Sequence, residues 1–466
     1  MSESSVQFKE QASRYTADLG HRRFIQTALS GYYLKRDEFK NRFHSWEHAR
    51  EAASAVKWDA VNHLDKHLDE FASKLEARGA KVFWAPGAAD ARDYILDLAR
   101  QRGAKLIIKS KSMTTEEIHL NDALEKDGYQ VIESDLGEYI VQLREEPPYH
   151  LVFPAMHLNR HEISHLFEEK LGSAPTDSPE ELTMIARRVM RLKYCQADIG
   201  ISGANFAIAE TGMISITENE GNARLTTALP KIHIAVVGIE KVLPKLSDLA
   251  LFLPMLATAG TGQPLTCYNS MLGGPRQPGE PDGPEEFHVV LLDNRRTEIL
   301  ADAEQRDSLH CIRCGACLNV CPIFKNVGGH SYGTVYQGPI GSVITPHLRG
   351  LQEWRHLSQA SSLCGACTEA CPVKINLHHH LLQNRRNAMS AAPLWWEKLL
   401  FAGYSYVMLR PALYSLAGRI GWLTQPFHSL VDGTIFDPVR AWTKTRTAPR
   451  LAPKSFRQLW RERKKP

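Results

Sequence analysis

Residues 311–322 read Cys311-Ile-Arg-Cys314-Gly-Ala-Cys317-Leu-Asn-Val-Cys321-Pro322, and this stretch decides the fold of the region around it. The spacing C-x2-C-x2-C-x3-C-P is typical of cysteines that bind iron–sulfur clusters. Three thiolates separated by two residues can surround one corner of a cubane cluster, and Gly315 permits a close approach of the backbone. Because Pro322 disfavours a helical backbone at Cys321, we expect this fourth cysteine to point away and to bind a second cluster.

A second run, Cys364-Gly-Ala-Cys367-Thr-Glu-Ala-Cys371-Pro372, repeats the first with Ser361 in place of its first cysteine. An exchange of fourth ligands between the runs assigns cluster 1 to Cys311, Cys314, Cys317 and Cys371, and cluster 2 to Cys321, Cys364 and Cys367. Cluster 1 is expected to be [4Fe-4S]. Cluster 2 is one thiolate short, so it is either [3Fe-4S] or [4Fe-4S] with another ligand. Ser361, water or a histidine such as His378 could fill that position.

The cysteine content favours iron–sulfur clusters over disulfides or zinc. Seven of the nine cysteines lie between Cys311 and Cys371, which indicates metal binding in a chain without a visible secretory signal. Zinc sites usually take two separated cysteine pairs, and seven thiolates suit two linked clusters better. Cys195 and Cys267 are predicted to be buried small apolar residues.

The segment between the two runs predicts a helical ferredoxin-type domain. It has 42 residues, more than a compact two-cluster ferredoxin needs. It begins with glycine-rich turns and continues into a predicted helix over 346–360.

Upstream of the cysteines the pattern predicts an α/β domain that ends near residue 300. Predicted strands at 82–85, 106–108 and 131–132 alternate with helices at 45–79, at 88–102 and after a capping box of Thr114 and Glu117. Such alternation indicates a parallel sheet covered by helices on both faces. Later elements are strands at 197–201, 204–209, 213–217, 232–237 and 287–292, helices at 160–171, 179–194 and 246–256, and a loop at 260–284. Residues 1–43 are expected to be helical.

A candidate ligand site lies at the ends of these strands. Lys109, Lys111 and Ser112 follow a strand and precede a helix, whose N-terminus attracts anions. Open sheets bind ligands at strand ends. Further candidates at such ends are Ser202–Asn205, Glu210, Thr211, Gly212 and Glu218–Glu220. A carboxylate or a phosphate could bind there; alternatively, these residues serve only as turns and caps. Catalytic residues are not indicated, because the chain shows neither a Ser/His/Asp order nor a GxGxxG loop.

The C-terminal region, residues 391–466, is rich in Trp and Arg. Residues 440–466 hold ten Lys or Arg and one acid, while the rest of the chain is slightly acidic. The bulk of the chain is therefore no nucleic-acid binder. The region either packs on the cysteine-rich domain, docks to a partner subunit or contacts an anionic membrane surface peripherally. The longest apolar run, 399–409, is too short to span a membrane, and we expect a cytoplasmic protein.

The chain resembles the lactate-utilisation iron–sulfur proteins of the LutB family over nearly its full length. The similarity rests on Lys109–Asn121, on Asp198–Gly212, on Arg313–Pro322 and on Leu363–Pro372. It implies a LUD domain related to ribose-phosphate isomerases and CoA transferases. It also implies an electron-transfer role in a multi-subunit system that oxidises L-lactate to pyruvate, with the other subunits as partners.

The expected organisation is thus a helical segment at 1–43, a LUD-like α/β domain at 44–300, a ferredoxin-type domain at 301–390 and the C-terminal region at 391–466. No flavin-binding pattern is visible, so the site that accepts two electrons at once is expected in a partner. Two other hypotheses remain: the LUD-like domain itself binds and oxidises a 2-hydroxy acid, or the chain is a redox-sensing binding module.

Overall fold

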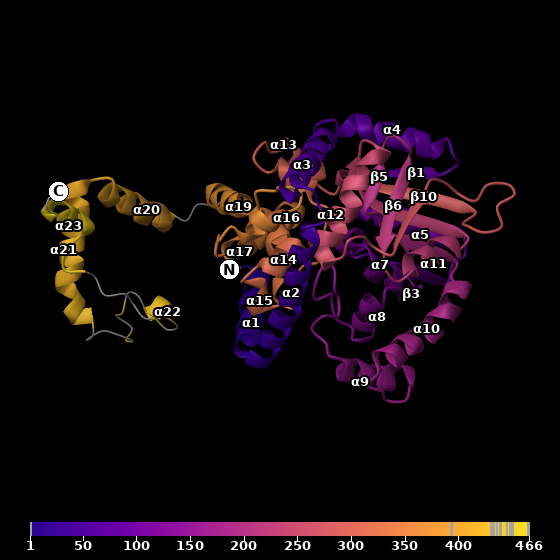
Figure 1. Ribbon diagram of the computed structural model, residues 1–466, viewed down its shortest axis with the longest axis horizontal. Coiled ribbons are helices and arrows are strands. Elements are labelled where there is room, and N and C mark those ends of the chain that lie inside the picture. The colour runs from indigo at the N-terminus through magenta and orange to yellow at the C-terminus, as the bar shows by residue number, and fades with distance from the viewer. Residues whose placement is uncertain are drawn as a thin grey trace. The chain divides into compact units, whose positions relative to one another are not determined.

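The structure is a computed structural model that describes residues 2–391, 395–428, 434, 437, 440–443, 446 and 452–463. The chain forms two compact units, Met1–Ala388 and Met389–Pro466 (Figure 1). None of the helices in these ranges combines the length and the apolar character that a membrane span requires.

A six-stranded parallel sheet forms the centre of the first unit, in the order β1-β10-β7-β4-β2-β3. Its strands are β1 (Lys81–Ala85), β2 (Leu106–Lys109), β3 (Gln130–Glu133), β4 (Ile199–Ser202), β7 (Ile232–Gly238) and β10 (Glu286–Leu292). Every neighbouring pair is parallel. The predicted α/β class and all six of these strands are confirmed.

Helices cover both faces of this sheet, as predicted. In β10 the side chain of Val289 packs in a core with α4 (Leu64–Glu76), whereas Val290 packs with α5 (Ala88–Gln101) and α7 (Leu120–Lys126). Figure 1 shows α4 and α5 on opposite sides of the strands. The remaining helices of this part are α6 (Met113–Glu117), α8 (Leu136–Leu143), α9 (Arg160–Leu171), α10 (Pro179–Gln196) and α11 (Asn222–Ala228).

Three sequence predictions about this part are wrong. The predicted loop at 260–284 contains strand β9 (Tyr268–Leu272), which joins β5 (Phe206–Ile208), β6 (Met213–Glu218) and β8 (Val242–Leu243) in a second sheet. The long helix predicted over 45–79 is divided at His63 into α3 (Trp46–Asn62) and α4. Thr114 is no helix cap, because the Ser112 side chain caps α6 by accepting the N–H of Thr115.

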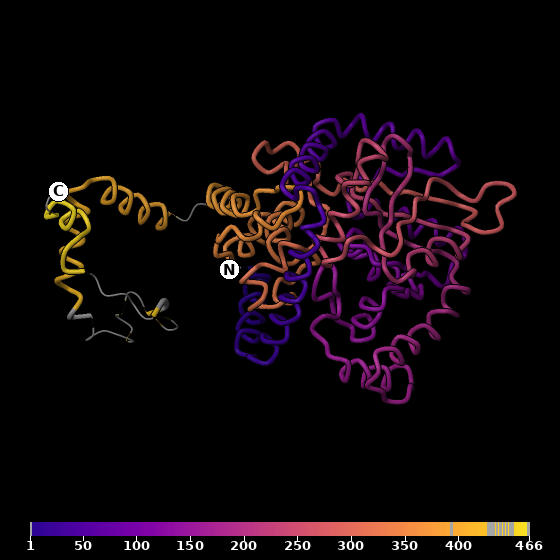
Figure 2. Tube along the Cα trace, viewed as in Figure 1, coloured from indigo at the N-terminus to yellow at the C-terminus, as the bar shows by residue number. Residues whose placement is uncertain are grey.

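The N-terminal helices α1 (Glu3–Ala17) and α2 (Leu19–Lys40) pack on the cysteine-rich region, although the two segments are far apart in the sequence. Phe8, Ile25 and Leu29 share a buried core with Phe324 and Tyr332. Figure 2 shows this indigo segment running beside the orange one. Helix α12 (Leu249–Thr261), which follows the short turns η1 (Ile239–Lys241) and η2 (Leu246–Asp248), belongs to the same core.

The regular secondary structure of the cysteine-rich region is helical in its described residues, as predicted. Its elements are α13 (Arg296–Ala301), η3 (Arg306–His310), α14 (Ala316–Val320), α15 (Phe324–Val327), η4 (His330–Tyr332), α16 (Gly338–Arg349), α17 (Leu351–Gln359), α18 (Ala366–Ala370) and α19 (Leu377–Ala391). The helix predicted over 346–360 is two helices, because Gly350 with φ 110° separates α16 from α17.

The second unit contains α20 (Trp395–Met408), α21 (Pro411–His428), α22 (Arg440–Thr443) and α23 (Phe456–Glu462). Large apolar side chains of α20 are exposed, among them Trp395, Leu399 and Phe401. The Trp442 side chain lies outside the described residues.

Candidate iron–sulfur centre and the adjoining cavity

The two cysteine runs have the same backbone conformation. Helices α14 and α18 each begin after a glycine in the left-handed region, Gly315 with φ 77° and Gly365 with φ 82°. Each helix ends at an extended cysteine, Cys321 or Cys371, with ψ 119° in both cases. A following proline favours this extended geometry. The internal repeat seen in the sequence is therefore also a structural repeat.

The cysteines gather in two groups that mix the runs. Cys311, Cys314 and Cys317 line one small cavity together with Cys371, beside Ile340 and Val373. Cys321 instead lies near Cys364, and both interact electrostatically with Cys367. The packing of α14 against α18 brings these residues together.

The surroundings of these thiols suit a metal cluster. Burial raises the pKa of the Cys371 thiol to about 12 and that of Cys367 to about 11. Such thiols become thiolates only when a strongly positive group binds them, and thiolates are preferred ligands of iron–sulfur clusters. Backbone N–H groups also point at the sulfurs: Arg313 N lies 3.4 Å from Cys311 Sγ and Ile375 N lies 3.3 Å from Cys371 Sγ. The donor set therefore fits an iron–sulfur cofactor.

Ser361 takes the place of the missing eighth cysteine. The backbone N–H of Leu363 donates to Ser361 Oγ at 3.1 Å, as that of Arg313 does to Cys311 Sγ. Leu363 and Arg313 are equivalent in the repeat and have positive φ values of 54° and 59°. The Ser361 hydroxyl oxygen therefore accepts the same backbone hydrogen bond as the Cys311 sulfur does in the first run. His378, the other side chain considered, places Nδ1 2.8 Å from the hydroxyl of Thr368.

A cavity of about 310 Å³ adjoins the first group of cysteines. Several predicted ligand-site residues line it: Lys111, Ser112, Gly203, Ala204, Asn205, Glu218, Asn219 and Glu220. Its wall also includes Cys314 and two basic residues that the sequence did not indicate, Lys241 and Arg313. Arg313 stands between two cysteines of the first run, and the spacing alone assigns it no binding role. No motif in the sequence includes Lys241.

The other five predicted site residues lie elsewhere. Ser202 Oγ lies 2.7 Å from His233 Nε2. Lys109 is buried and forms ion pairs with Glu133 at 2.8 Å and with Glu116 at 2.9 Å. Glu210 accepts the N–H of Leu246 at 2.7 Å. Thr211 and Gly212 complete the turn between β5 and β6, where both N–H groups donate to the Ile208 carbonyl. The structure therefore brings eight of the thirteen candidate residues to the cavity, Lys111 and Ser112 among them.

The acidic groups in the cavity wall already have partners. Glu218 accepts the backbone N–H groups of Ala223 and Arg224, and Asp135 caps α8 through the N–H of Glu138. Burial, with a smaller contribution from Asp135, raises the pKa of Glu220 to about 7. These groups make part of the cavity wall acidic, but all three accept backbone N–H groups, Glu220 from Leu136.

A buried histidine clamps the first cysteine run to the α/β part. His150 Nδ1 accepts the backbone N–H groups of Val152 and Phe153, so Nε2 carries the proton and donates to Asn319 Oδ1. Asn319, between Cys317 and Cys321, donates in turn to the Gly260 carbonyl at 3.2 Å. Burial lowers the pKa of His150 to about 3, so this tautomer persists at neutral pH. A Cβ at Gly260 would lie 2.8 Å from the Cys314 carbonyl oxygen, so only glycine allows this approach.

An ion network centred on Arg296 joins the same two parts. The guanidinium donates to Glu117 at 2.7 Å and to Glu240 at 2.5 Å, and all three side chains are at most 5% exposed. Glu240 also pairs with Arg313 at 3.3 Å. Burial alone would raise the pKa of Glu240, but Arg296 and Arg313 hold it at about 2. Burial would likewise raise the pKa of Glu117, but Arg296 keeps it below its usual value, so both carboxylates are ionised at neutral pH.

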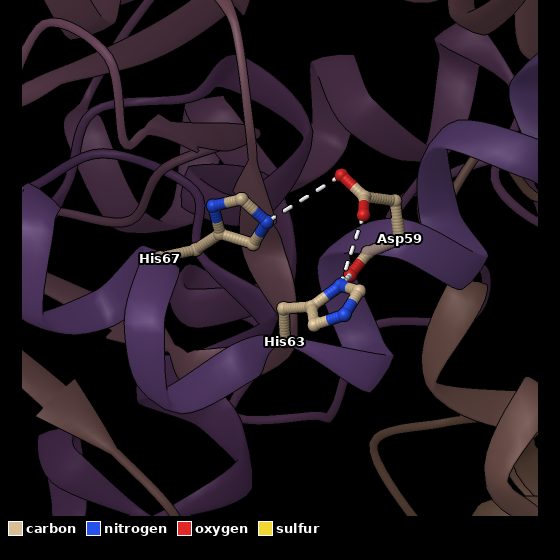
Figure 3. A group of neighbouring side chains, drawn as sticks. All are labelled: Asp59, His63 and His67. Atoms are coloured by element: carbon tan, nitrogen blue, oxygen red, sulfur yellow. Dashed lines mark hydrogen bonds and ion pairs between the residues drawn. The ribbon is translucent and has the colours of Figure 1, made fainter.

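One further cluster of side chains has a simple structural explanation. Asp59 lies between two imidazoles, with one oxygen 2.9 Å from His63 Nδ1 and the other 3.5 Å from His67 Nε2 (Figure 3). This shared carboxylate accounts for the grouping of the three residues.

The two cysteines outside the runs differ from expectation. Cys195 and Cys267 are exposed, so their predicted burial is wrong.

Comparison with known proteins gives three family matches along the chain. They are the LUD domain at residues 68–292, the 4Fe-4S dicluster domain at 307–375 and the C-terminal region of lactate utilisation protein B at 373–465. Relatives named lactate utilization protein B are similar over nearly the full length. Those of Bacillus velezensis and Bacillus licheniformis are each 43% identical, over 98% of this chain and 97% of the relative. That of Bacillus subtilis is 41% identical, over 98% and 96%.

Proposed function

Because the chain belongs to the lactate utilization protein B family, we propose that it is the iron–sulfur electron-transfer component of a multi-subunit system that oxidises L-lactate to pyruvate. The observation that carries this proposal is the gathering of cysteines from both runs around one cavity. It is what two interlinked clusters require of the chain. The family name supports lactate as the substrate of the system.

In this proposal cluster 1 is [4Fe-4S] and is held by Cys311, Cys314, Cys317 and Cys371, while Cys321, Cys364 and Cys367 hold cluster 2. When bound, such clusters supply one-electron transfer. The chain holds them in a largely apolar setting, and its N–H groups donate to the sulfurs, which tunes the reduction potential. Because Cys364 is exposed while Cys317 and Cys371 are buried, cluster 2 is the one that faces the surface.

We expect anaerobically purified protein to contain about eight irons per chain if an oxygen ligand completes cluster 2, and about seven if it is a three-iron cluster. Iron and sulfide analysis with electron paramagnetic resonance (EPR) measures this. Ser361→Cys should convert an open or oxygen-ligated cluster 2 to full cysteine ligation, because Ser361 matches Cys311. Ser362→Cys, at an exposed neighbouring position, is the matched control. Stoichiometric zinc without visible absorption would contradict the iron–sulfur assignment.

We expect the purified chain alone to be inactive with L-lactate and a dye acceptor, and active only with its partner subunits. One-electron centres cannot by themselves accept the electron pair of the alcohol.

Deletion of residues 391–466 should weaken assembly and leave the clusters intact. Exposed aromatic side chains of α20 suit an interface, and every ligand cysteine precedes residue 372. Pull-down and iron analysis of truncated and full-length protein test this. Normal partner binding with lost clusters would show instead that the region stabilises the ferredoxin-type domain.

A second candidate function is oxidation of the 2-hydroxy acid by the LUD domain itself. It is favoured by the cavity whose wall contains Cys314. Turnover of L-lactate by the isolated chain would establish this function and reject the division of labour proposed above.

A further inference from the structure

Two basic side chains at the cysteine side of the 310 Å³ cavity have unused hydrogen-bonding capacity. Lys241 is 7% exposed, and the described residues give it no hydrogen-bond or ion-pair partner. Arg313 reaches Glu240 through Nη2 at 3.3 Å, but its Nη1 is buried without a hydrogen bond. Buried cations are costly unless something pairs with them.

The nearby Lys57 is also buried but has a hydrogen-bond partner, so burial alone does not explain why Lys241 has none. Lys57 is 2% exposed and also lies near the cluster-binding loop, but its ammonium donates to the Glu240 carbonyl at 2.6 Å. It does not line the cavity. Lys241 faces the cavity instead, so the partner that it lacks within the protein can be supplied by a ligand.

The charges around the cavity decide the sign of that ligand. Glu240, the acid next to Lys241 and Arg313, is already shared with Arg296 at 2.5 Å. Across the cavity Glu218 and Asp135 hold backbone N–H groups, and Lys111 donates to the Val152 carbonyl at 2.7 Å. Glu220 accepts the backbone N–H of Leu136. The Cys311 thiolate attracts Lys241 and Arg313, but neither side chain donates a hydrogen bond to it among the described residues. Lys241 and Arg313 are therefore the charged side chains with unused donors, so the ligand has an anionic end next to Cys314.

We propose that this cavity binds a small monocarboxylate of the 2-hydroxy or 2-oxo acid class, with its carboxylate between Lys241 and Arg313. Neutral donors are available for the second oxygen. Ser112 Oγ accepts the N–H of Thr115 and keeps its own proton to donate, and Asn205 Oδ1 accepts the N–H of Thr217, which leaves its amide N–H groups free. The carboxylate site follows from the geometry, whereas the choice of acid class rests on the proposed function.

The volume agrees with this assignment. Ligand cavities in proteins begin at about 300 Å³, so a three-carbon acid fits with room for water. Since Arg313 precedes Cys314, a carboxylate bound there lies against the loop that holds cluster 1. The site therefore places the organic acid next to the first of the two clusters.

The test is isothermal titration of the holoprotein, full-length and cluster-loaded, with L-lactate and with pyruvate. Lactamide, the neutral analogue, and propionate, which lacks the 2-oxygen, are the comparison ligands. Lys241→Met removes the charge and Lys241→Arg retains it. Arg50→Met is the matched control, because Arg50 donates to the Cys371 carbonyl at 2.9 Å but does not line the cavity. Iron content and EPR spectra of each variant report cluster integrity.

We expect Lys241→Met to weaken binding about tenfold or more, as for loss of a hydrogen bond to a charged group, and Lys241→Arg and Arg50→Met to retain it. Lactamide should not bind detectably, and propionate should bind more weakly than lactate. Adding pyruvate should change the EPR signal of the reduced wild type but not that of Lys241→Met. Equal binding of lactate and lactamide, or unchanged binding in a cluster-loaded Lys241→Met protein, would overturn the proposal. An intact iron count and activity in the assembled system would then leave the electron-transfer function standing.

Discussion

Replacing Cys371 by alanine is expected to destroy cluster 1, the one bound by Cys311, Cys314 and Cys317, and to spare the cluster of its own neighbours in sequence. About four of eight irons should be lost. The reason is geometric: Cys371 lines the same cavity as the first three cysteines, while Cys364 and Cys367 interact with Cys321. Iron analysis and EPR of the reduced protein measure the loss.

Two other cysteine variants make the Cys371 experiment decisive. Cys367→Ala should remove cluster 2 and leave the signal of cluster 1. Cys195→Ala should change neither, because Cys195 is exposed and lies far from both runs in sequence. If Cys371→Ala and Cys367→Ala removed the same EPR signal, the exchange of ligands between the runs would be rejected.

Arg296→Met is expected to destabilise the fold strongly. It leaves Glu117 and Glu240 buried, with the guanidinium that both carboxylates share removed. Breaking such a buried network by removing one partner costs roughly 3–5 kcal/mol of unfolding free energy. The midpoint of urea unfolding, followed by circular dichroism under anaerobic conditions, measures this.

The neighbouring Arg295 provides the matched control for this measurement. Its ion pair with Glu298 is 2.7 Å long but exposed, with side chains 44% and 61% accessible. Arg295→Met should therefore cost at most about 1 kcal/mol. Equal midpoints for the two variants would show that the buried network does not stabilise the fold.

The elements that the sequence predicted correctly are those with a local signal. The six strands of the parallel sheet are short apolar runs between turn residues, and their type is legible without knowledge of their partners. Strand β9 was missed because Tyr268–Leu272 lies among glycines and prolines, and it is a strand only because it pairs with β6.

The capping box failed for a non-local reason. Thr114 and Glu117 have the right spacing, but Glu117 binds Arg296, 179 residues further along the chain. Ser112 caps the helix in their place. A buried ion pair with a distant residue thus outweighs a local motif whose cap is worth only about 1 kcal/mol.

The candidate ligand site was predicted in part for the same reason. Lys111 and Ser112 stand at a strand end and reach the cavity, as that position suggests. Lys109, two residues earlier, does not line the cavity and forms ion pairs with Glu133 and Glu116 instead. Lys241 and Arg313 meet there only through the fold, since 72 residues separate them in the sequence.

The packing of α1 and α2 on the cysteine-rich region has a consequence for biosynthesis. Phe8 and Ile25 leave the ribosome first, but their buried partners Phe324 and Tyr332 are about 300 residues further along. Since translation proceeds at about 5–20 residues per second, the apolar faces of these helices remain without their partners for roughly 15–60 s. The last cluster cysteine, Cys371, lies about 40 residues further along and is made roughly 2–10 s later still. Maturation of this chain is therefore a late event, in which closure of the N-terminal helices and delivery of iron and sulfide both follow translation of most of the polypeptide.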